Sequence, residues 1–360
     1  MVERIKYIIN LAVVVLMFAT IAIVRDGRVA GVEVSDLFAN EDKTDEPIET
    51  TLADGVRVIN SLTLGKDVIG FGGRTPVSLY VKDDVIQRVE VGKNSETPSF
   101  MNQVAQSGLF ERWNGVALKD AATMSVDGVS GATYTSVAIV ENVKRAAQYG
   151  ASVEAVSSNP LSNIGLKDVL GLLVIFSGVI LTFVKSRSKP LVTLQLVLNV
   201  VVLGFWCGSF LSLATFTTWV ANGVNLSLSI VSFAMLCVVV IVPLLGKKGS
   251  YCHLHCPMGS AQELISRVPL TKIKIKPQVA KFLNNLRYYI LAALLFIMWL
   301  GVGFELMDYE IFSAFIISSA STAVLIMAAI FLILSLFIQK PYCRFVCPTG
   351  ALITMAQKTK

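Results

Sequence analysis

Four of the six cysteines lie in two matching seven-residue segments. These segments are Tyr-Cys-His-Leu-His-Cys-Pro at 251–257 and Tyr-Cys-Arg-Phe-Val-Cys-Pro at 342–348. The cysteines are Cys252, Cys256, Cys343 and Cys347. Closely spaced, repeated cysteines in a reducing compartment indicate a metal site rather than disulfides. Four thiolates match the ligand set of one iron–sulfur cluster or one structural zinc ion.

The proline after each second cysteine favours the iron–sulfur interpretation, because Cys-Pro pairs are typical of ferredoxin loops. We therefore predict one 4Fe–4S cluster shared by both segments, which requires that the two loops meet. Three alternatives stay open: two clusters that are each completed by a partner subunit, one zinc ion, and structural thiols without a metal.

The remaining cysteines and the only two histidines give weaker indications. Cys207 and Cys237 fall inside predicted membrane segments, where cysteine commonly behaves as a small hydrophobic residue. The alternative is that they help to hold an intramembrane redox centre. His253 and His255 lie inside the first cysteine segment. They are candidates for a Rieske-like role, but we favour neighbours of the ligands or solvated loop residues, because the second segment has no matching histidine.

Six apolar runs are long enough to position these segments in a membrane. Hydrophobic residues make up 54% of the 360-residue chain, and the mean hydropathy is +0.66. A helix of about 20 apolar residues spans a bilayer core of roughly 30 Å. The runs lie near 7–24, 166–184, 191–211, 226–246, 287–306 and 312–338. We predict that the first is an uncleaved anchor rather than a signal peptide, because Arg25-Asp26 follows it directly without a small-residue cleavage site.

Charge predicts the orientation of these runs. Basic residues concentrate in 185–189, 247–287 and 340–360, whereas 212–225 contains no Lys or Arg and 305–310 contains only acidic charges. The positive-inside rule then places both termini in the cytoplasm and residues 25–163 outside, in a bacterial inner (cytoplasmic) membrane. This topology explains the net charge of +6, so the charge gives no reason to expect a nucleic-acid partner. No pair of charged residues falls in mid-span, so a transporter lacks support.

The polar part of the chain predicts a compact domain outside the membrane. We expect an N-terminal membrane anchor at 1–26, a linker at 27–54 and an α+β domain at 55–152. Within that domain, 76–81 and 85–91 have the character of strands, while 98–106 and 136–149 have that of helices. Val137, Val140, Val143 and Ala147 share one face of the last helix. The glycines at 70–73 indicate a close backbone approach.

The loop before the last predicted helix is a second candidate site. It reads Asp127-Gly-Val-Ser-Gly-Ala-Thr133 and presents the Thr133 hydroxyl among small residues. Free backbone N–H groups at the start of the following helix favour a phosphate at this position.

This loop resembles the flavinylation motif Asp-x-x-Ser/Thr-Gly-Ala-Thr of the FMN-binding domain family. The family includes the G subunit of Rnf complexes and the C subunit of sodium-pumping quinone reductase, and the resemblance covers about residues 65–150. The matching residues are Asp127, Ser130, Gly131, Ala132 and Thr133. The resemblance implies that a dedicated flavin transferase joins FMN covalently to Thr133 through a phosphoester. Glu96 and Thr97, before Pro98, are similar to the Glu-Thr-Pro segment that lies beside the flavin in that family.

The whole layout is similar to a wider family. An outer FMN-binding domain followed by a five-helix membrane domain at 160–360 with two Cys-x3-Cys-Pro loops resembles the accessory flavoproteins of nitrous oxide reductase and of reductive dehalogenases. The cysteine pair also resembles the membrane ferredoxin-like subunit that accompanies periplasmic nitrate reductase. The chain lacks the long cytoplasmic ferredoxin tail of the nitrous-oxide type, which puts that specific role in doubt.

We therefore predict a polytopic α-helical membrane protein with six transmembrane helices and an extracytoplasmic α+β FMN-binding domain. Its predicted function is electron transfer between a cytoplasmic-side iron–sulfur cluster and extracytoplasmic FMN, as a component of an oxidoreductase system rather than a stand-alone enzyme. A cytoplasmic donor or membrane quinol, an extracytoplasmic reductase or carrier, and other membrane subunits are the expected partners. The alternative is a redox sensor or a maturation factor for an extracytoplasmic metalloenzyme.

Overall fold

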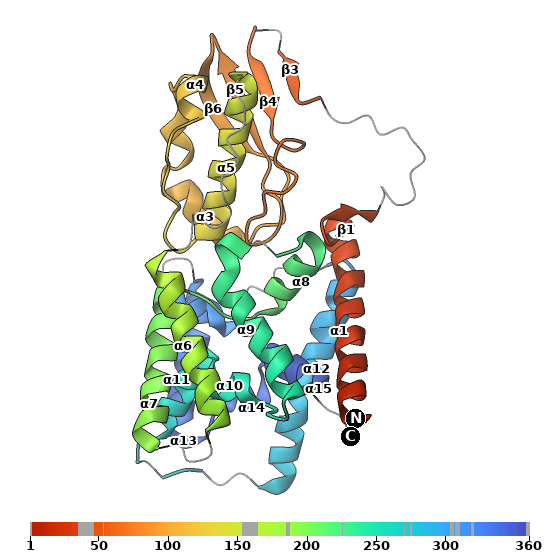
Figure 1. Cartoon of the computed structure of the whole chain (residues 1–360), viewed down its shortest axis with the longest axis vertical. Helices are drawn as coiled ribbons and strands as arrows, with labels where there is room; N and C mark the ends of the chain where they lie inside the picture. Colours follow the sequence, from red (N-terminus) through yellow and green to blue (C-terminus); the bar gives the residue numbers. More distant parts are fainter. Residues whose placement is uncertain are drawn as a thin grey trace. The chain divides into compact units, whose positions relative to one another are not determined.

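The computed structural model separates into two compact units. It describes residues 2–34, 47–52, 54–152, 165–184, 188–224, 226–269, 271–273, 276–302, 306, 310–317 and 320–357. The unit that contains Asp26–Asn159 and Ala221–Gly223 is called the sheet unit here. The unit that contains Met1–Arg25, Pro160–Val220 and Val224–Lys360 is called the helical unit. Figure 1 shows the elements of both.

A four-stranded antiparallel sheet forms one layer of the sheet unit. Its order follows the sequence, with β3 (Glu49–Thr51), β4 (Arg57–Asn60), β5 (Val77–Lys82) and β6 (Val85–Val91) side by side. The strands predicted at 76–81 and 85–91 are confirmed. The sheet begins at Glu49, upstream of the expected start of the domain at residue 55, and the short strands β1 (Arg28–Val29) and β2 (Val32–Glu33) pair within the segment expected to be a linker.

Helices pack on the sheet through an apolar core. They are α3 (Pro98–Gln106), η1 (Phe110–Trp113), α4 (Leu118–Ala121) and α5 (Thr133–Gly150). The helix predicted at 98–106 is confirmed, and α5 begins three residues before the helix predicted at 136–149. The predicted buried face of α5 is only partly right: Val143 and Ala147 are buried, whereas Val137 and Val140 are half-buried. The reason is that this face also takes in Ile139 and Ala146, so it is centred about one residue away from the predicted stripe.

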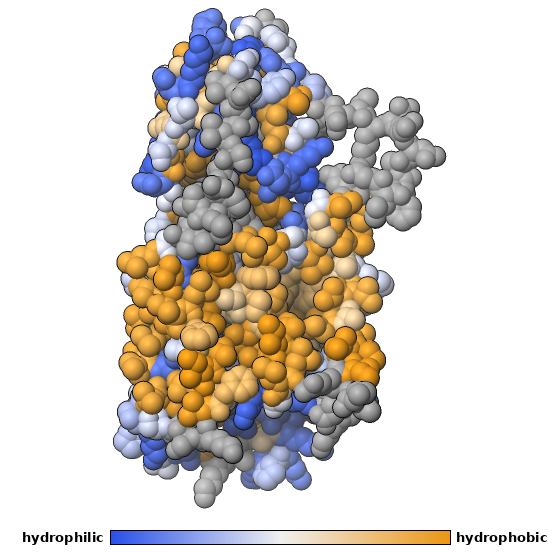
Figure 2. Space-filling view, in the orientation of Figure 1, coloured by the Kyte–Doolittle hydropathy of each residue, from blue (hydrophilic) through white to orange (hydrophobic). Residues whose placement is uncertain are grey.

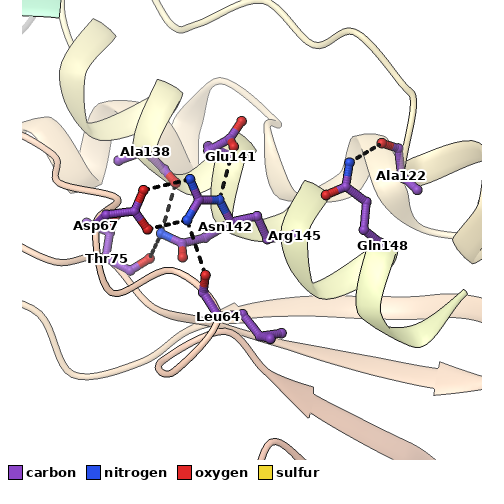
Figure 3. A network of polar contacts seen from close by, with 9 residues as sticks. All are labelled: Leu64, Asp67, Thr75, Ala122, Ala138, Glu141, Asn142, Arg145 and Gln148. Carbon is purple, nitrogen blue, oxygen red and sulfur yellow. Dashed lines mark hydrogen bonds and ion pairs between the residues drawn. The ribbon is translucent and has the colours of Figure 1, made fainter. Parts of the chain in front are cut away.

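A polar network fastens α5 to the loop between β4 and β5, as Figure 3 shows. The Arg145 guanidinium donates to the Leu64 carbonyl at 3.2 Å, to Glu141 Oε1 at 3.1 Å and to both carboxylate oxygens of Asp67. Asn142 Nδ2 donates to the carbonyls of Thr75 and Ala138 at 3.0 Å. Because a guanidinium presents several donors in a fixed plane, one side chain binds two positions of the loop, Leu64 and Asp67, to α5.

The network predicts a local loss of stability in Arg145→Met. This variant keeps the aliphatic stem of the side chain but removes the donors, leaving the Leu64 carbonyl without its charge-assisted bond. We expect the opening free energy of α5 to fall by about 1–3 kcal/mol, measured by hydrogen–deuterium exchange of α5 peptides in the full-length protein. The matched control is Arg88→Met, whose half-exposed ion pair with Glu90 is worth less than about 1 kcal/mol. Equal protection in Arg145→Met and the wild type would contradict the structural role.

Apolar helices build the helical unit, which gives the protein its mostly helical character. Their bounds are α1 (Val2–Asp26), α6 (Leu166–Phe183), α7 (Lys189–Leu198) with its π-helical continuation η2 (Asn199–Trp206), α8 (Leu213–Asn222), α9 (Leu226–Leu244), α10 (Ser250–Leu254), α11 (Pro257–Ser266), α12 (Pro277–Trp299), η4 (Ile311–Phe315), α13 (Thr322–Phe337), α14 (Pro341–Phe345) and α15 (Pro348–Ala356). Hydrophobic side chains cover the face of this unit displayed in Figure 2. This distribution suits a lipid environment.

Four helices in the described part of the chain are long and apolar enough to cross a membrane. They are Ile5–Asp26, Leu166–Phe183, Lys189–Trp206 and Pro277–Trp299. Two of the six predicted spans correspond instead to the shorter apolar helices Ser229–Leu244 and Thr322–Phe337. The structure thus supports a membrane location with four candidate spans, and six crossings remain a prediction.

The bounds of the last two predicted spans need correction. The helix expected at 287–306 begins at Pro277, because proline at the first helical position is compatible with a helix start. Arg287, expected in a loop, therefore lies inside α12. The run expected at 312–338 is divided, since Ile311–Phe315 forms the separate turn η4 and the continuous helix is only Thr322–Phe337.

Two segments expected at the outer surface fold back into the helical unit. The Leu211 N–H donates to the Tyr251 hydroxyl at 3.3 Å, and the Leu213 N–H donates to Glu310 Oε2 at 3.0 Å. Glu310 is buried, with 6% of its surface exposed. The first turn of α8 and Glu310, which belong to the segments 212–225 and 305–310 without basic residues, are therefore buried in the helical unit, and the assignment of membrane sides stays a prediction. The fold-back is possible because polar groups inside the unit satisfy these backbone and carboxylate groups.

Candidate functional site

The two cysteine segments have the same local structure. Each begins with a residue in the left-handed region, Gly249 at φ 74° and Lys340 at φ 49°. A single helical turn follows, α10 in the first segment and α14 in the second. Cys256 and Cys347 then cap α11 and α15, with proline at the first helical position of each. The matching sequences therefore build matching turns that place two thiols on each loop.

The two loops meet inside the helical unit. Gln262 on α11 accepts a hydrogen bond from the Tyr342 N–H at 3.2 Å, and its Nε2 donates to Cys343 Sγ at 3.6 Å. In the reverse direction, Gln357 after α15 accepts from the Gly249 N–H at 2.9 Å. Each loop is thus held by a glutamine that follows the other loop. This contact is what one shared cluster requires.

The thiols lie in a dry environment and act on one another. Cys256 and Cys347 are each 4% exposed. Burial first, and then the charge of Cys252, raises the pKa of Cys256 to about 12. Burial, followed by Cys256 and Cys252, raises the pKa of Cys343 well above its usual range. Four such thiols ionise together only if a bound cationic centre compensates their charge, as metal coordination does.

The arrangement fits a cluster better than a single ion. The Gly350 N–H donates to Cys347 Sγ at 3.1 Å, and Gln262 donates to Cys343 Sγ, so both sulfurs receive hydrogen bonds of the kind that stabilise cluster thiolates. In the described part of the chain, no three His, Cys, Asp or Glu side chains converge on a position for one metal ion. A zinc ion would need its sulfur ligands at about 2.3 Å. The two hydrogen bonds to sulfur therefore agree with iron–sulfur ligation, and a zinc ion stays the alternative.

The two histidines of the first loop have different surroundings. His255 is fully buried, and a Cβ added at Gly178 of α6 would lie 2.8 Å from its Nε2. Burial lowers the pKa of His255 to about 4, so its ring is neutral at pH 7. His253 is exposed, and its Nδ1 lies 3.2 Å from Lys340 Nζ. These positions agree with our preference for non-ligand roles.

The two remaining cysteines belong to different surroundings. Cys207 Sγ donates to the Lys167 carbonyl at 3.2 Å and lies against Gly171, near the first turn of α6. The loop histidine His255 instead contacts Gly178, about two helical turns further along α6. Cys237 lies within α9 and is half-buried. The described geometry gives neither thiol a place beside the four loop cysteines.

Three residues near the loops were missed by sequence reasoning. Gln262 bridges the loops, Arg287 Nη1 lies 3.4 Å from the Cys343 carbonyl, and Glu310 accepts from the Thr349 hydroxyl at 2.6 Å. Arg287 and Glu310 are far from the cysteines in sequence, and no local pattern marks them. The sequence indicated a role for Arg287 and Glu310 only through their position beside apolar runs, where an arginine or an acid is unusual.

The second candidate site surrounds the first turn of α5 in the sheet unit. Thr133 is the first residue of α5, and its Oγ1 lies 3.4 Å from the Val129 carbonyl. Gly131 takes a left-handed φ of 86°, and the Ser136 hydroxyl accepts from the Val129 N–H at 2.8 Å. The Ser130 carbonyl accepts from Gln103 of α3 at 2.8 Å. These contacts fold the loop back on α5, while Asp127 and Ser130 stay exposed.

Glu96 contacts the first turn of α5, and Thr97 precedes α3. Both are buried, and Glu96 Oε2 accepts from the Thr135 hydroxyl at 2.6 Å, two residues after Thr133. A Cβ added at Gly70 would lie 2.1 Å from Glu96 Oε1, and one at Gly72 would lie 2.1 Å from the Ser95 carbonyl oxygen. Glycine is therefore required at both positions, which confirms the predicted close approach at 70–73.

Comparison with known families separates the two sites into two domains. Residues 70–148 match the family described as FMN-binding domain. Residues 228–276 and 320–359 match the family described as 4Fe-4S binding domain. The chain therefore combines an FMN-binding domain with a 4Fe–4S binding domain. No curated protein and no solved structure matches the chain, so the resemblance to particular accessory flavoproteins stays a prediction.

Single cysteine variants distinguish one shared cluster from two. If both loops hold the same 4Fe–4S group, Cys252→Ser and Cys343→Ser each lose all of the protein-bound iron, because three thiolates do not complete the ligand set. Iron and sulfide analysis of anaerobically purified protein measures this loss. Cys237→Ser is the control and keeps the full iron content. Retention of half of the iron in each single-loop variant would instead support separate clusters.

Proposed function

We propose that this protein transfers electrons across a membrane between FMN attached at Thr133 and one 4Fe–4S cluster held by four cysteines. The ligands in this proposal are Cys252, Cys256, Cys343 and Cys347. The observation that carries the proposal is that FMN-binding and 4Fe–4S binding domains share one chain whose helical unit contains candidate membrane spans. The basic loops support a cytoplasmic cluster and an extracytoplasmic flavin domain.

The residues around the thiols exclude water and donate hydrogen bonds to sulfur, which suits one-electron chemistry. When bound, the cluster supplies a reversible one-electron couple. Gly350 and Gln262 donate hydrogen bonds to sulfur and so stabilise negative charge on the ligands. Tyr251 and Tyr342 are buried beside the first cysteine of each loop and exclude water from that side. The Tyr251 hydroxyl also accepts from the Leu211 N–H at 3.3 Å, which holds the first loop against the segment before α8.

The start of α5 supplies what a covalently attached flavin phosphate needs. Thr133 presents its hydroxyl at the N-terminus of an 18-residue helix, where unsatisfied backbone N–H groups and the helix dipole favour a phosphate. Ser130, Gly131 and Ala132 are small, so a flavin transferase can approach. The contact of Glu96 with Thr135 in the first turn of α5 supports the proposal that Glu96 and Thr97 contact FMN.

The folded-back segments support a path for electrons inside the helical unit. A bilayer core of roughly 30 Å is too thick for one efficient tunnelling step. The Tyr342 ring lies 6.2 Å from the Phe312 ring, which stacks on the Phe210 ring at 5.8 Å. Phe210 is three residues after Cys207, whose thiol binds the first turn of α6. These ring contacts therefore lead from Tyr342 of the second cysteine loop to Phe210, close in sequence to Cys207 and its contact with the first turn of α6.

A cytoplasmic donor or a membrane quinol supplies electrons in this proposal, and an extracytoplasmic reductase or carrier accepts them. Further membrane subunits are compatible with the exposed apolar surface of the helical unit. The protein then acts as an electron-transfer component of an oxidoreductase system.

Covalent flavin attachment predicts a simple gel result. Wild-type protein co-expressed with a flavin transferase should show a fluorescent band after denaturing electrophoresis, and Thr133→Val should show none, because the variant has no hydroxyl for the phosphoester. Thr123→Val is the matched control, since Thr123 is exposed and its hydroxyl only contacts the Asp120 carbonyl. A fluorescent Thr133→Val band of wild-type intensity would rule out attachment at this position.

Transmembrane electron transfer predicts a vectorial reaction in proteoliposomes. An impermeant reductant on the side of the basic loops should reduce an impermeant acceptor trapped inside vesicles, with an ionophore present to prevent charge accumulation. Cys343→Ser should lower this rate by at least tenfold, while Cys237→Ser should leave it unchanged. An equal rate in Cys343→Ser and wild type, with the flavin intact, would exclude the cysteine site as the electron carrier.

A further inference from the structure

A carboxylate is buried in the helical unit next to the second cysteine loop. Glu310 is 6% exposed and precedes the turn η4. Its Oε1 accepts from the Thr349 hydroxyl at 2.6 Å, and its Oε2 accepts from the Leu213 N–H at 3.0 Å. Thr349 is two residues after Cys347. An ionisable residue inside a membrane unit is costly to bury and is therefore a candidate functional site.

The described helices around Glu310 contribute few other charges, while Glu305 and Asp308 precede it in the sequence at positions outside the described residues. The helices α8, α13 and α15 contain no ionisable residue. The acid of α11, Glu263, lies 3.2 Å from Lys340 and 3.7 Å from Arg267, its ion-pair partners. The ionisable groups on which Glu310 acts are Tyr342 of α14 and Cys347. The carboxylate and the cysteine loop thus share one low-dielectric region.

Electrostatic coupling between these groups follows from their burial. Burial first, then Cys343 and then Glu310, raises the pKa of Cys347. Like charges in a low-dielectric region repel strongly, and adding negative charge near a carboxylate raises the pKa of that carboxylate. An electron added at the cysteine site therefore favours protonation of Glu310.

A row of hydroxyl groups on α8 leads away from Glu310. Ser212, Thr215 and Thr218 are three residues apart and share one helical face. The hydroxyl oxygens of Ser212 and Thr215 are 2.9 Å apart, and Arg25 Nη2 donates to Thr218 Oγ1 at 3.4 Å. Six residues of helix correspond to about 9 Å. These hydroxyls lie between the Leu213 N–H, which binds Glu310, and the contact of Thr218 with Arg25 near the C-terminal end of α1.

We propose that Glu310 is a proton site that takes up one proton when the four-cysteine site gains one electron and releases it when the electron leaves. This proposal rests on the proposed function. The electron comes from the donor that reduces the cysteine site, and the proton comes from the medium along the α8 hydroxyl row. One O–H bond forms on the Glu310 carboxylate and one O–H bond breaks in the water of the medium that supplies the proton, while each hydroxyl of the row gives up one proton as it accepts another. The net charge of the buried region then stays constant through each electron-transfer cycle.

A purely structural role makes a different prediction. Glu310 also ties η4 to α8 and α15, and a glutamine at this position retains a carbonyl oxygen that can accept one of these hydrogen bonds. Glu310→Gln therefore removes the titrating group while keeping the size of the side chain. Thr349→Val removes a donor that favours the ionised carboxylate and so raises the pKa of Glu310.

The test is the midpoint potential of the cysteine-bound centre against pH, measured by redox titration with electron paramagnetic resonance on full-length protein in nanodiscs. Glu310 has one pKa when the cysteine site is oxidised and a higher one when it is reduced. Between these two values we expect the wild-type potential to fall by up to about 59 mV per pH unit, the value for one proton and one electron. Glu310→Gln should lose this slope. Thr349→Val should keep it but at higher pH, and the control Glu263→Gln should keep it in the original pH range.

Redox-difference infrared spectroscopy gives an independent measurement. Reduction of the wild type should produce the C=O band of a protonated carboxylic acid, and Glu310→Gln should lack it. If Glu310→Gln does not assemble, the wild-type band and its displacement in Thr349→Val decide the matter. A pH-independent wild-type potential, or a pH slope retained in Glu310→Gln, would overturn the proton site. Wild-type protein without a paramagnetic iron–sulfur signal would instead overturn the proposed function.

Discussion

The burial of four thiols inside an apolar helical unit is the constraint on which the rest of this structure depends. A buried thiolate without compensation costs several kcal/mol, and here the thiols raise one another's pKa beyond the effect of burial. In the proposed function, one shared cluster offsets that cost and joins two loops that are about ninety residues apart in sequence. The glutamines Gln262 and Gln357 provide reciprocal contacts that hold the two loops together.

The two halves of the helical unit share a motif but differ in their surroundings. Both loops use a left-handed residue, a single helical turn and a Cys-Pro helix start. Around the first loop, His255 packs on Gly178 of α6. Around the second, Thr349 binds the buried Glu310. The repeated motif supplies equivalent ligands, while the different neighbours give each loop its own electrostatic environment.

The polar interior of the helical unit also explains how irregular chain is tolerated there. Backbone groups without a partner are costly in lipid, yet 207–213 and 310–316 enter the unit. The Tyr251 hydroxyl and the Glu310 carboxylate accept from Leu211 and Leu213 and so satisfy this backbone. In the sheet unit, Arg145 and Asn142 do the same for the loop between β4 and β5. Buried polar residues thus determine where the chain departs from regular structure.

The sequence by itself determined the local features of this protein. The cysteine spacing, the strands β5 and β6, the helix α3 and the Thr133 loop were all predictable, because each depends on neighbouring residues and on the short periods of helices and strands. Only the tertiary structure decided that α12 starts at Pro277, that the two loops share Gln262, and that Glu310 lies beside Thr349 rather than at the surface. These features depend on contacts between residues far apart in the chain, and an apolar run has the same composition whether it crosses a membrane, forms a short turn or folds back into the core.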